Sequence, residues 1–288
     1  MANPPHVFAT PEDLGAEAAR IIADGIRTAG VRGRRFLLGC PSGRSPRSTY
    51  AALAQIVRDQ QLDLSHLVIV MMDDYLVRRP DGGLVPEDPT APHSCLRFAR
   101  EQIVDVLSAA AGTGPARTAQ PGLTSQCCIA DDHLWMPDPA HPGRYDDLIR
   151  EAGGIDIFLL ASGATDGHVA FNPPGAARSS RTRVVELAVS TRTDNLATFP
   201  SFGGELARVP RYGVTVGLAT IGELSQGVIL LVHGADKGQA TARLAAANSY
   251  DPTWPATIFR ECRRPLFFVD SAAAEAAGMI VTRDRKDA

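Results

Sequence analysis

An aspartate and a histidine stand two residues apart in the segment Asp166-Gly167-His168. They follow an apolar run, residues 155–160, that is typical of a buried strand. A glycine-containing turn after such a strand places polar side chains at its carboxyl end, where open α/β sheets bind ligands. An Asp–His pair there can exchange protons with a bound substrate. An ordinary Asp-Gly turn with a surface histidine would explain the same segment, so both interpretations stay open at this point.

Two adjacent carboxylates, Asp73 and Asp74, follow the apolar run 67–72 in the same way. Repulsion between them at the mouth of a parallel sheet can raise the pKa of one toward the range of a general base. Helix capping or plain solvation would also account for the pair. No further carboxylates stand at a spacing that completes a divalent-metal shell, so we predict no metal here.

Two other loops have the composition of an anion site. The loop 41–46 contributes the candidate phosphate-binding residues Ser42, Gly43, Arg44 and Ser45. Its glycine lets backbone N–H groups approach an anion, and the helix expected after it adds positive potential. It lacks the Gly-Lys-Ser/Thr ending of a Walker loop. Lys237 follows another apolar run, where its ammonium group can contact a phosphate.

These loops need a scaffold that alternates strands with helices, and the hydrophobic pattern predicts one. Strands are expected at 35–40, 66–72, 155–160, 182–187, 214–218, 227–232 and 265–269. Helices are expected at 11–30, 49–53, 96–111, 145–152, 237–247 and after residue 269, with irregular segments at 79–94 and 112–144. The alternation predicts a Rossmann-like α/β fold, doubly wound, with a mainly parallel sheet and helices on both faces. We see no repeat or linker and therefore expect a single domain over residues 1–288.

The composition excludes several other classes of protein. The net charge is −3 with both signs scattered, so neither a nucleic-acid partner nor a membrane surface is expected. The apolar runs are too short to span a bilayer and the first residues lack signal-peptide features, so we expect a cytoplasmic protein. The five cysteines contain no CxxC spacing and are expected to be free thiols.

The order of the motifs resembles the glucosamine-6-phosphate deaminase/isomerase family, a relative of the 6-phosphogluconolactonases. The resemblance covers residues 33–270 and is carried by the segments 41–46, 72–75, 163–174, 180–183, 209–217 and 234–237. The string Asp-Gly-His-Val-Ala-Phe-Asn, residues 166–172, with Ser-Arg-Thr-Arg at 180–183, is more similar to the deaminase branch than to the lactonases.

The resemblance implies a sugar-phosphate substrate and deamination coupled to aldose–ketose isomerisation, with no cofactor. Asp73 would move a proton between C1 and C2 of the open-chain sugar, and His168, oriented by Asp166, would protonate the ring oxygen. Ser42, Gly43 and Lys237 would hold the phosphate, whose binding energy positions the reacting carbons. The other residues expected to contact substrate are Arg44, Ser45, Asp74, Gly167 and Asn172. The family also implies a homo-oligomer.

The chain departs from the family pattern at three positions. Pro173 stands where the deaminases carry a Glu that belongs with the Asp–His group, and Ala197 stands where they carry a phosphate-binding Arg. Arg44 stands where Gly is more usual, and its guanidinium can replace the missing Arg or select a different ligand. The residues of the family's regulatory site are only partly matched, so we expect no such regulation.

Two alternatives therefore stay open. One is lactone hydrolysis in which His168 activates water, because this reaction needs no C–H abstraction and tolerates the loss of the Glu. The other is a sugar-phosphate-binding protein without catalysis, although a pure binder has no use for the proton-transfer set Asp73, Asp166 and His168.

Overall fold

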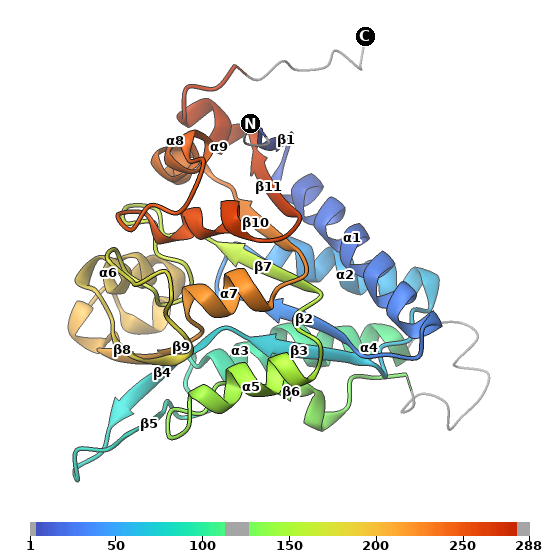
Figure 1. Cartoon of the computed structure of the whole chain (residues 1–288), viewed down its shortest axis with the longest axis horizontal. Helices are drawn as coiled ribbons and strands as arrows, with labels where there is room; N and C mark the ends of the chain where they lie inside the picture. The colour runs from blue at the N-terminus through green and yellow to red at the C-terminus, as the bar shows by residue number, and fades with distance from the viewer. Residues whose placement is uncertain (1–3, 113–126, 281–288) are drawn as a thin grey trace.

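A seven-stranded sheet forms the centre of the computed structural model, which describes residues 4–112 and 127–280 (Figure 1). Its strand order is β1-β11-β10-β7-β2-β3-β6, and each neighbouring pair is parallel. The strands are β1 (His6–Phe8), β2 (Phe36–Cys40), β3 (Leu67–Met71), β6 (Leu134–Trp135), β7 (Ile157–Ala161), β10 (Val228–Val232) and β11 (Pro265–Asp270). The predicted parallel α/β sheet is thus confirmed.

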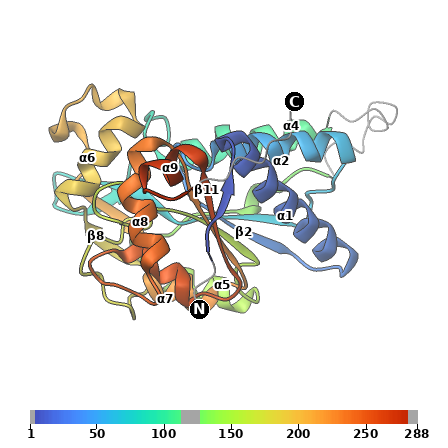
Figure 2. The same cartoon turned by 90° about the horizontal axis from the view of Figure 1, so that it is seen from above.

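Helices cover both faces of this sheet because side chains along each strand alternate between two apolar cores. In β2, Phe36 and Leu38 join one core, whereas Leu37 joins the other. The first core is covered by α1 (Pro11–Val31), α2 (Arg47–Gln60), α3 (Cys95–Ala99) and α4 (Asp105–Gly112). The second is covered by α5 (Gly143–Glu151), α7 (Leu218–Leu224), α8 (Gly238–Ala246) and α9 (Ser271–Ala276). Figure 2 shows α1, α2 and α4 on the opposite side of the sheet from α5 and α7.

Local sequence explains where the helices begin. Thr10 caps α1 by accepting a hydrogen bond from the backbone of Asp13, and Pro11 occupies the first turn, as expected.

The single helix expected at 96–111 is divided by a π-helical turn, Arg100–Val104, between α3 and α4. A π turn inserts an extra residue and so shifts the helical face, a change that the hydrophobic spacing does not reveal.

A second, antiparallel sheet was not predicted. It consists of β5 (Leu84–Pro86), β4 (Asp73–Arg78), β9 (Tyr212–Thr215) and β8 (Arg183–Glu186), in that order. The expectation of an irregular segment at 79–94 is wrong where β5 forms, and β6 likewise interrupts the segment 112–144. Asp73 follows the end of β3, as expected, and it also begins β4, where it lies opposite Thr215. Its partner strand lies more than a hundred residues away in the chain, which local patterns cannot show.

The strand order creates a crevice beside β2. The chain runs from β2 to β3 and β6 on one side, whereas β7, β10 and β11 lie on the other. The loops that leave β2 and β7 therefore diverge, which is the arrangement that opens a ligand crevice at the carboxyl ends of parallel strands. Among the described residues, no helix has both the length and the apolar character needed to cross a bilayer. That residues 1–288 form one domain stays a prediction.

Candidate active site

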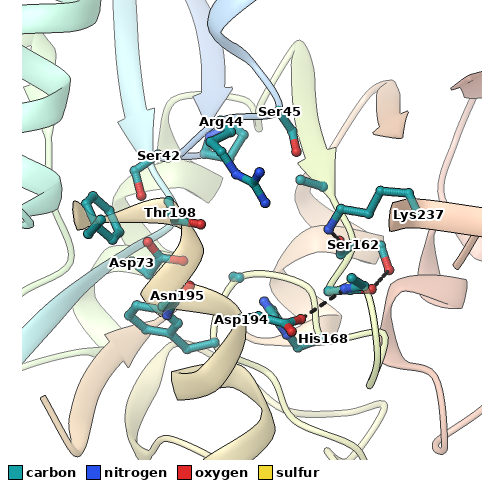
Figure 3. Close-up of a pocket in the computed structure, with 18 of the residues that line it drawn as sticks. Ser42, Arg44, Ser45, Asp73, Ser162, His168, Asp194, Asn195, Thr198 and Lys237 are labelled. Carbon is teal, nitrogen blue, oxygen red and sulfur yellow. Dashed lines mark hydrogen bonds between the residues drawn. The ribbon is translucent and has the colours of Figure 1, made fainter. Parts of the chain in front are cut away.

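A cavity of about 410 Å³ opens in this crevice (Figure 3). Its walls come from the loops after β2, β7 and β10, from the start of β4 and from the helix α6 (Val189–Thr198). The predicted site residues that line it are Ser42, Gly43, Arg44, Ser45, Asp73, His168 and Lys237. The structure therefore brings the carboxylate, the imidazole and the cations to one cavity.

The carboxylate of Asp73 is buried at the inner end of the cavity, with only 4% of the residue exposed. Burial raises its pKa to about 7, and the charge of Asp74 adds to the rise. Repulsion between the neighbouring carboxylates thus acts in the predicted direction, but desolvation is the larger cause. The thiol of Cys95 donates a weak hydrogen bond to Oδ1 of Asp73 at 3.6 Å. A carboxylate with a pKa near 7 can both accept and return a proton at neutral pH.

The imidazole of His168 is held by Asp166. Nδ1 of His168 lies 2.7 Å from Oδ1 of Asp166, whose other oxygen accepts hydrogen bonds from the hydroxyls of Ser190 and Thr191. Burial by itself would raise the pKa of Asp166, but the hydrogen bond from His168, its charge and the Ser190 hydroxyl hold that pKa well below its usual range. Asp166 is therefore ionised, and Nε2 of His168 stays available for a ligand.

Cationic and polar groups gather on the other side of the cavity. Nζ of Lys237 donates to the carbonyl of Ser162 at 2.8 Å, and burial lowers the pKa of this lysine. Arg44 is half-exposed, and its guanidinium lies 3.8 Å from the carboxylate of Asp236. The loop before α2 turns at Gly43, where φ is +91°, a conformation that favours glycine. These groups can bind a phosphate through charge-assisted hydrogen bonds.

Four predicted site residues do not line the cavity. Asp166 does not reach the cavity itself but is hydrogen-bonded to His168, which does. Oδ1 of Asp74 accepts the backbone N–H groups of Tyr75 and Cys95, and burial raises its pKa to about 6. Gly167 has φ +64°, and a Cβ there would lie 2.3 Å from the ring of Trp254.

The fourth, Asn172, is fully buried. Its Nδ2 donates to the carbonyls of Val169 and Val216, and its Oδ1 accepts from Arg183. Neither Asn172 nor Asp74 lines the cavity, and the side-chain amide of Asn172 and Oδ1 of Asp74 have partners inside the protein, so a contact of either residue with substrate stays a prediction.

Sequence reasoning missed the contribution of α6. Asp194, Asn195 and Thr198 line the cavity from this helix. These residues do not follow an apolar run that predicts a strand. Only the departure from the family pattern at Ala197 pointed to this segment. The side chain of Ala197 itself lies outside what the structure describes.

One grouping of possible metal ligands occurs in the part of the chain that the structure describes. Single ligand atoms of Asp166, His168 and Asp194 lie within 4.8 Å of one another. Both carboxylates already accept hydrogen bonds from backbone or hydroxyl groups. The grouping is therefore explained by contacts inside the protein.

Comparisons with known proteins place these features in context. The family model "Glucosamine-6-phosphate isomerases/6-phosphogluconolactonase" matches residues 9–268. A glucosamine-6-phosphate deaminase of Rhodopirellula baltica is 34% identical over 263 residues, which cover 91% of each chain. One of Rhodococcus jostii is 33% identical over 266 residues, 92% of this chain and 89% of that protein.

Solved structures agree with the architecture. A monomeric glucosamine-6-phosphate deaminase superposes with a TM-score of 0.77 at 25% identity, over 95% of this chain and 100% of that one. The 6-phosphogluconolactonase of Trypanosoma brucei gives a TM-score of 0.60 at 22% identity, over 96% and 99%, which shows the shared fold alone. Because the first of these is monomeric, self-association of this chain stays a prediction.

Proposed function

The chain belongs to the Glucosamine-6-phosphate isomerases/6-phosphogluconolactonase family, and from this premise we propose that it deaminates an amino-sugar phosphate while isomerising it from aldose to ketose. The observation that carries the proposal is the convergence of a buried carboxylate, an Asp-held imidazole and two cationic side chains on one cavity. We also propose that the protein is located in the cytoplasm.

Asp73 serves as the base for the carbon-bound proton. It removes the proton from C2 of the open-chain sugar, which gives a C1=C2 double bond, and returns that proton to C1. A second proton passes from the amino group to the C1 oxygen, which leaves a C=N bond at C2. Water adds to this bond and releases ammonia and the ketose. A carboxylate suits this task when its pKa lies near the working pH, and burial gives Asp73 a pKa of about 7.

His168 opens the sugar ring. With Nδ1 bound to Asp166, its Nε2 can deliver a proton to the ring oxygen while a proton leaves the C1 hydroxyl. Lys237 and Arg44 hold the phosphate from the opposite side. Arg44 supplies the guanidinium that the family places at the position of Ala197, because its side chain lines the cavity beside Asp236 and is exposed enough to turn toward a ligand.

A product assay tests the proposal. Purified protein is incubated with hexose phosphates, aminohexose phosphates and 6-phosphogluconolactone, and ammonia, ketose, acid and exchange of the C2 proton with D₂O are followed. We expect ammonia and ketose from an aminohexose phosphate, with C2 exchange that Asp73→Asn abolishes. Acid from the lactone without any exchange would overturn the proposal.

Lactone hydrolysis is a second candidate because of one observation, the proline at position 173. Hydrolysis needs only water activated by His168 and no C–H abstraction. It therefore predicts that His168→Gln abolishes turnover of the lactone, whereas Asp73→Asn leaves most of it. Saturable binding of sugar phosphates with no product of either kind would support a binding protein in place of both.

A further inference from the structure

Asp194 stands on α6, and its carboxylate faces the same cavity as His168 (Figure 3). One ring nitrogen of His168 and one carboxylate oxygen from each of Asp166 and Asp194 all lie within 4.8 Å of one another. The histidine therefore has two acidic neighbours, one from its own turn and one from a helix about thirty residues further along the chain.

The position of the Asp194 carboxylate is defined by hydrogen bonds to the turn after β7. Oδ2 accepts the backbone N–H of Ala164 at 3.0 Å, and Oδ1 accepts the hydroxyl of Thr165 at 3.4 Å. Ser190 and Thr191, about one helical turn earlier on α6, donate to Asp166. One face of α6 thus holds the turn that carries the Asp–His pair, and it keeps a second negative charge beside the ring.

The two carboxylates have different surroundings. The side chain of Asp166 is 7% exposed and is occupied by His168 and the two hydroxyls. Asp194 is half-buried and lines the open cavity, and its charge also reaches Lys237. The remaining charged or titratable groups on the cavity walls are Arg44, Asp73, Tyr75, His233 and Asp236. Of these, Asp73, His233 and Asp236 do not belong to the group of ligand atoms that lie within 4.8 Å of one another.

We propose that Asp194 is a positioning residue that acts through His168, as the second carboxylate that keeps its imidazolium form available for ring opening. In this role it stands in for the acid that Pro173 removes from the segment after His168. A negative charge beside a ring stabilises the protonated ring, and the effect is larger in a cavity that is partly shielded from water. The role in turnover rests on the proposed function, whereas the electrostatic effect on His168 does not.

The test is Asp194→Asn. The side-chain oxygen of asparagine can still accept a hydrogen bond from the backbone N–H of Ala164. The variant therefore removes the negative charge and keeps the hydrogen bond that joins α6 to the turn. Asp236→Asn is the matched control, because it removes one charge from the same cavity outside the cluster around His168. The ring resonances of His168 are titrated by NMR in all three proteins without sugar, with His168→Gln used for their assignment.

We expect His168 to titrate at lower pH in Asp194→Asn than in the unchanged protein, because a neighbouring negative charge is gone, and at the same pH in Asp236→Asn. With the amino-sugar phosphate, kcat at neutral pH falls about tenfold in Asp194→Asn, and the melting temperature stays within about two degrees. An unchanged titration would overturn the proposal, even if activity fell. A shifted titration in a protein that turns over no sugar would support the electrostatic role and count against the proposed function alone.

Discussion

Asp73→Asn is expected to make the protein more stable at alkaline pH while it abolishes isomerisation. The carboxyl group has a pKa of about 7 in the folded protein and an ordinary value of 3.8 in the unfolded chain. Below pH 4 both states hold the proton, and the residue has no effect on the pH dependence of stability. Between pH 4 and 7 the unfolded chain loses its proton while the folded protein keeps it, so stability falls as the pH rises.

The size of the effect follows from the shift. About three pKa units correspond to about 4 kcal/mol, the free energy that the folded protein loses by pH 8 because it must hold a desolvated charge. Asparagine has a similar shape and no charge to bury. The advantage of Asp73→Asn should therefore grow from near zero at pH 4 to about 4 kcal/mol at pH 8.

Urea unfolding of the two proteins at pH 4.5, 6 and 8 measures this difference. Asp147→Asn is the control, because Asp147 is exposed and pairs only with Arg150 on the surface of α5, where such pairs contribute little. It should change stability by less than about 0.5 kcal/mol at each pH. A gain for Asp73→Asn that is the same at pH 4.5 and pH 8, or no gain at all, would refute the reasoning.

Three further outcomes follow from the site. Asp74→Asn removes a charge that raises the pKa of Asp73, so the acidic limb of the kcat/KM profile should move to lower pH; a limb that stays in place would show that burial alone sets it. Gly163→Ala would place a Cβ 2.3 Å from Nδ1 of His168 and should lower kcat about a hundredfold. Gly222→Ala is its control, because the nearest atoms there are 3.9 Å away. Lys237→Met should raise KM for the sugar phosphate about ten- to a hundredfold with a smaller effect on kcat, as measured by steady-state kinetics; an unchanged KM would place the phosphate elsewhere.

Much of the main sheet could be predicted because its strands are buried on both faces. Such strands appear as short apolar runs, for example Val228–Val232, and the helices between them show their own period and caps. The polar residues that follow these runs were therefore recognisable as candidates. His168 and Lys237 both follow a β-strand and both line the cavity.

In the second sheet, β8 lies within the strand expected at residues 182–187 and β9 overlaps the one expected at 214–218, whereas β4 and β5 were not expected as strands. β5 has only three residues, and β4 pairs with β9, which lies far along the chain. Asp73 was correctly placed after the end of β3, but its position at the start of β4 and the burial that dominates its pKa were not foreseen. Asn172 shows the reverse case, because a polar residue in a promising motif has all its hydrogen-bonding groups engaged inside the fold.

The sequence by itself determined which turns carry polar groups, since the period of apolar residues marks where each buried strand ends. Only the tertiary structure decided which of these turns meet, because the strand order, and not the spacing along the chain, makes β2 and β7 neighbours and so puts the loops after them on the walls of one cavity. The same holds for the position of Asp194, which depends on how α6 packs on the distant turn after β7. Contacts between segments far apart in the chain do not alter the spacing of apolar residues within either segment, so that spacing cannot predict them.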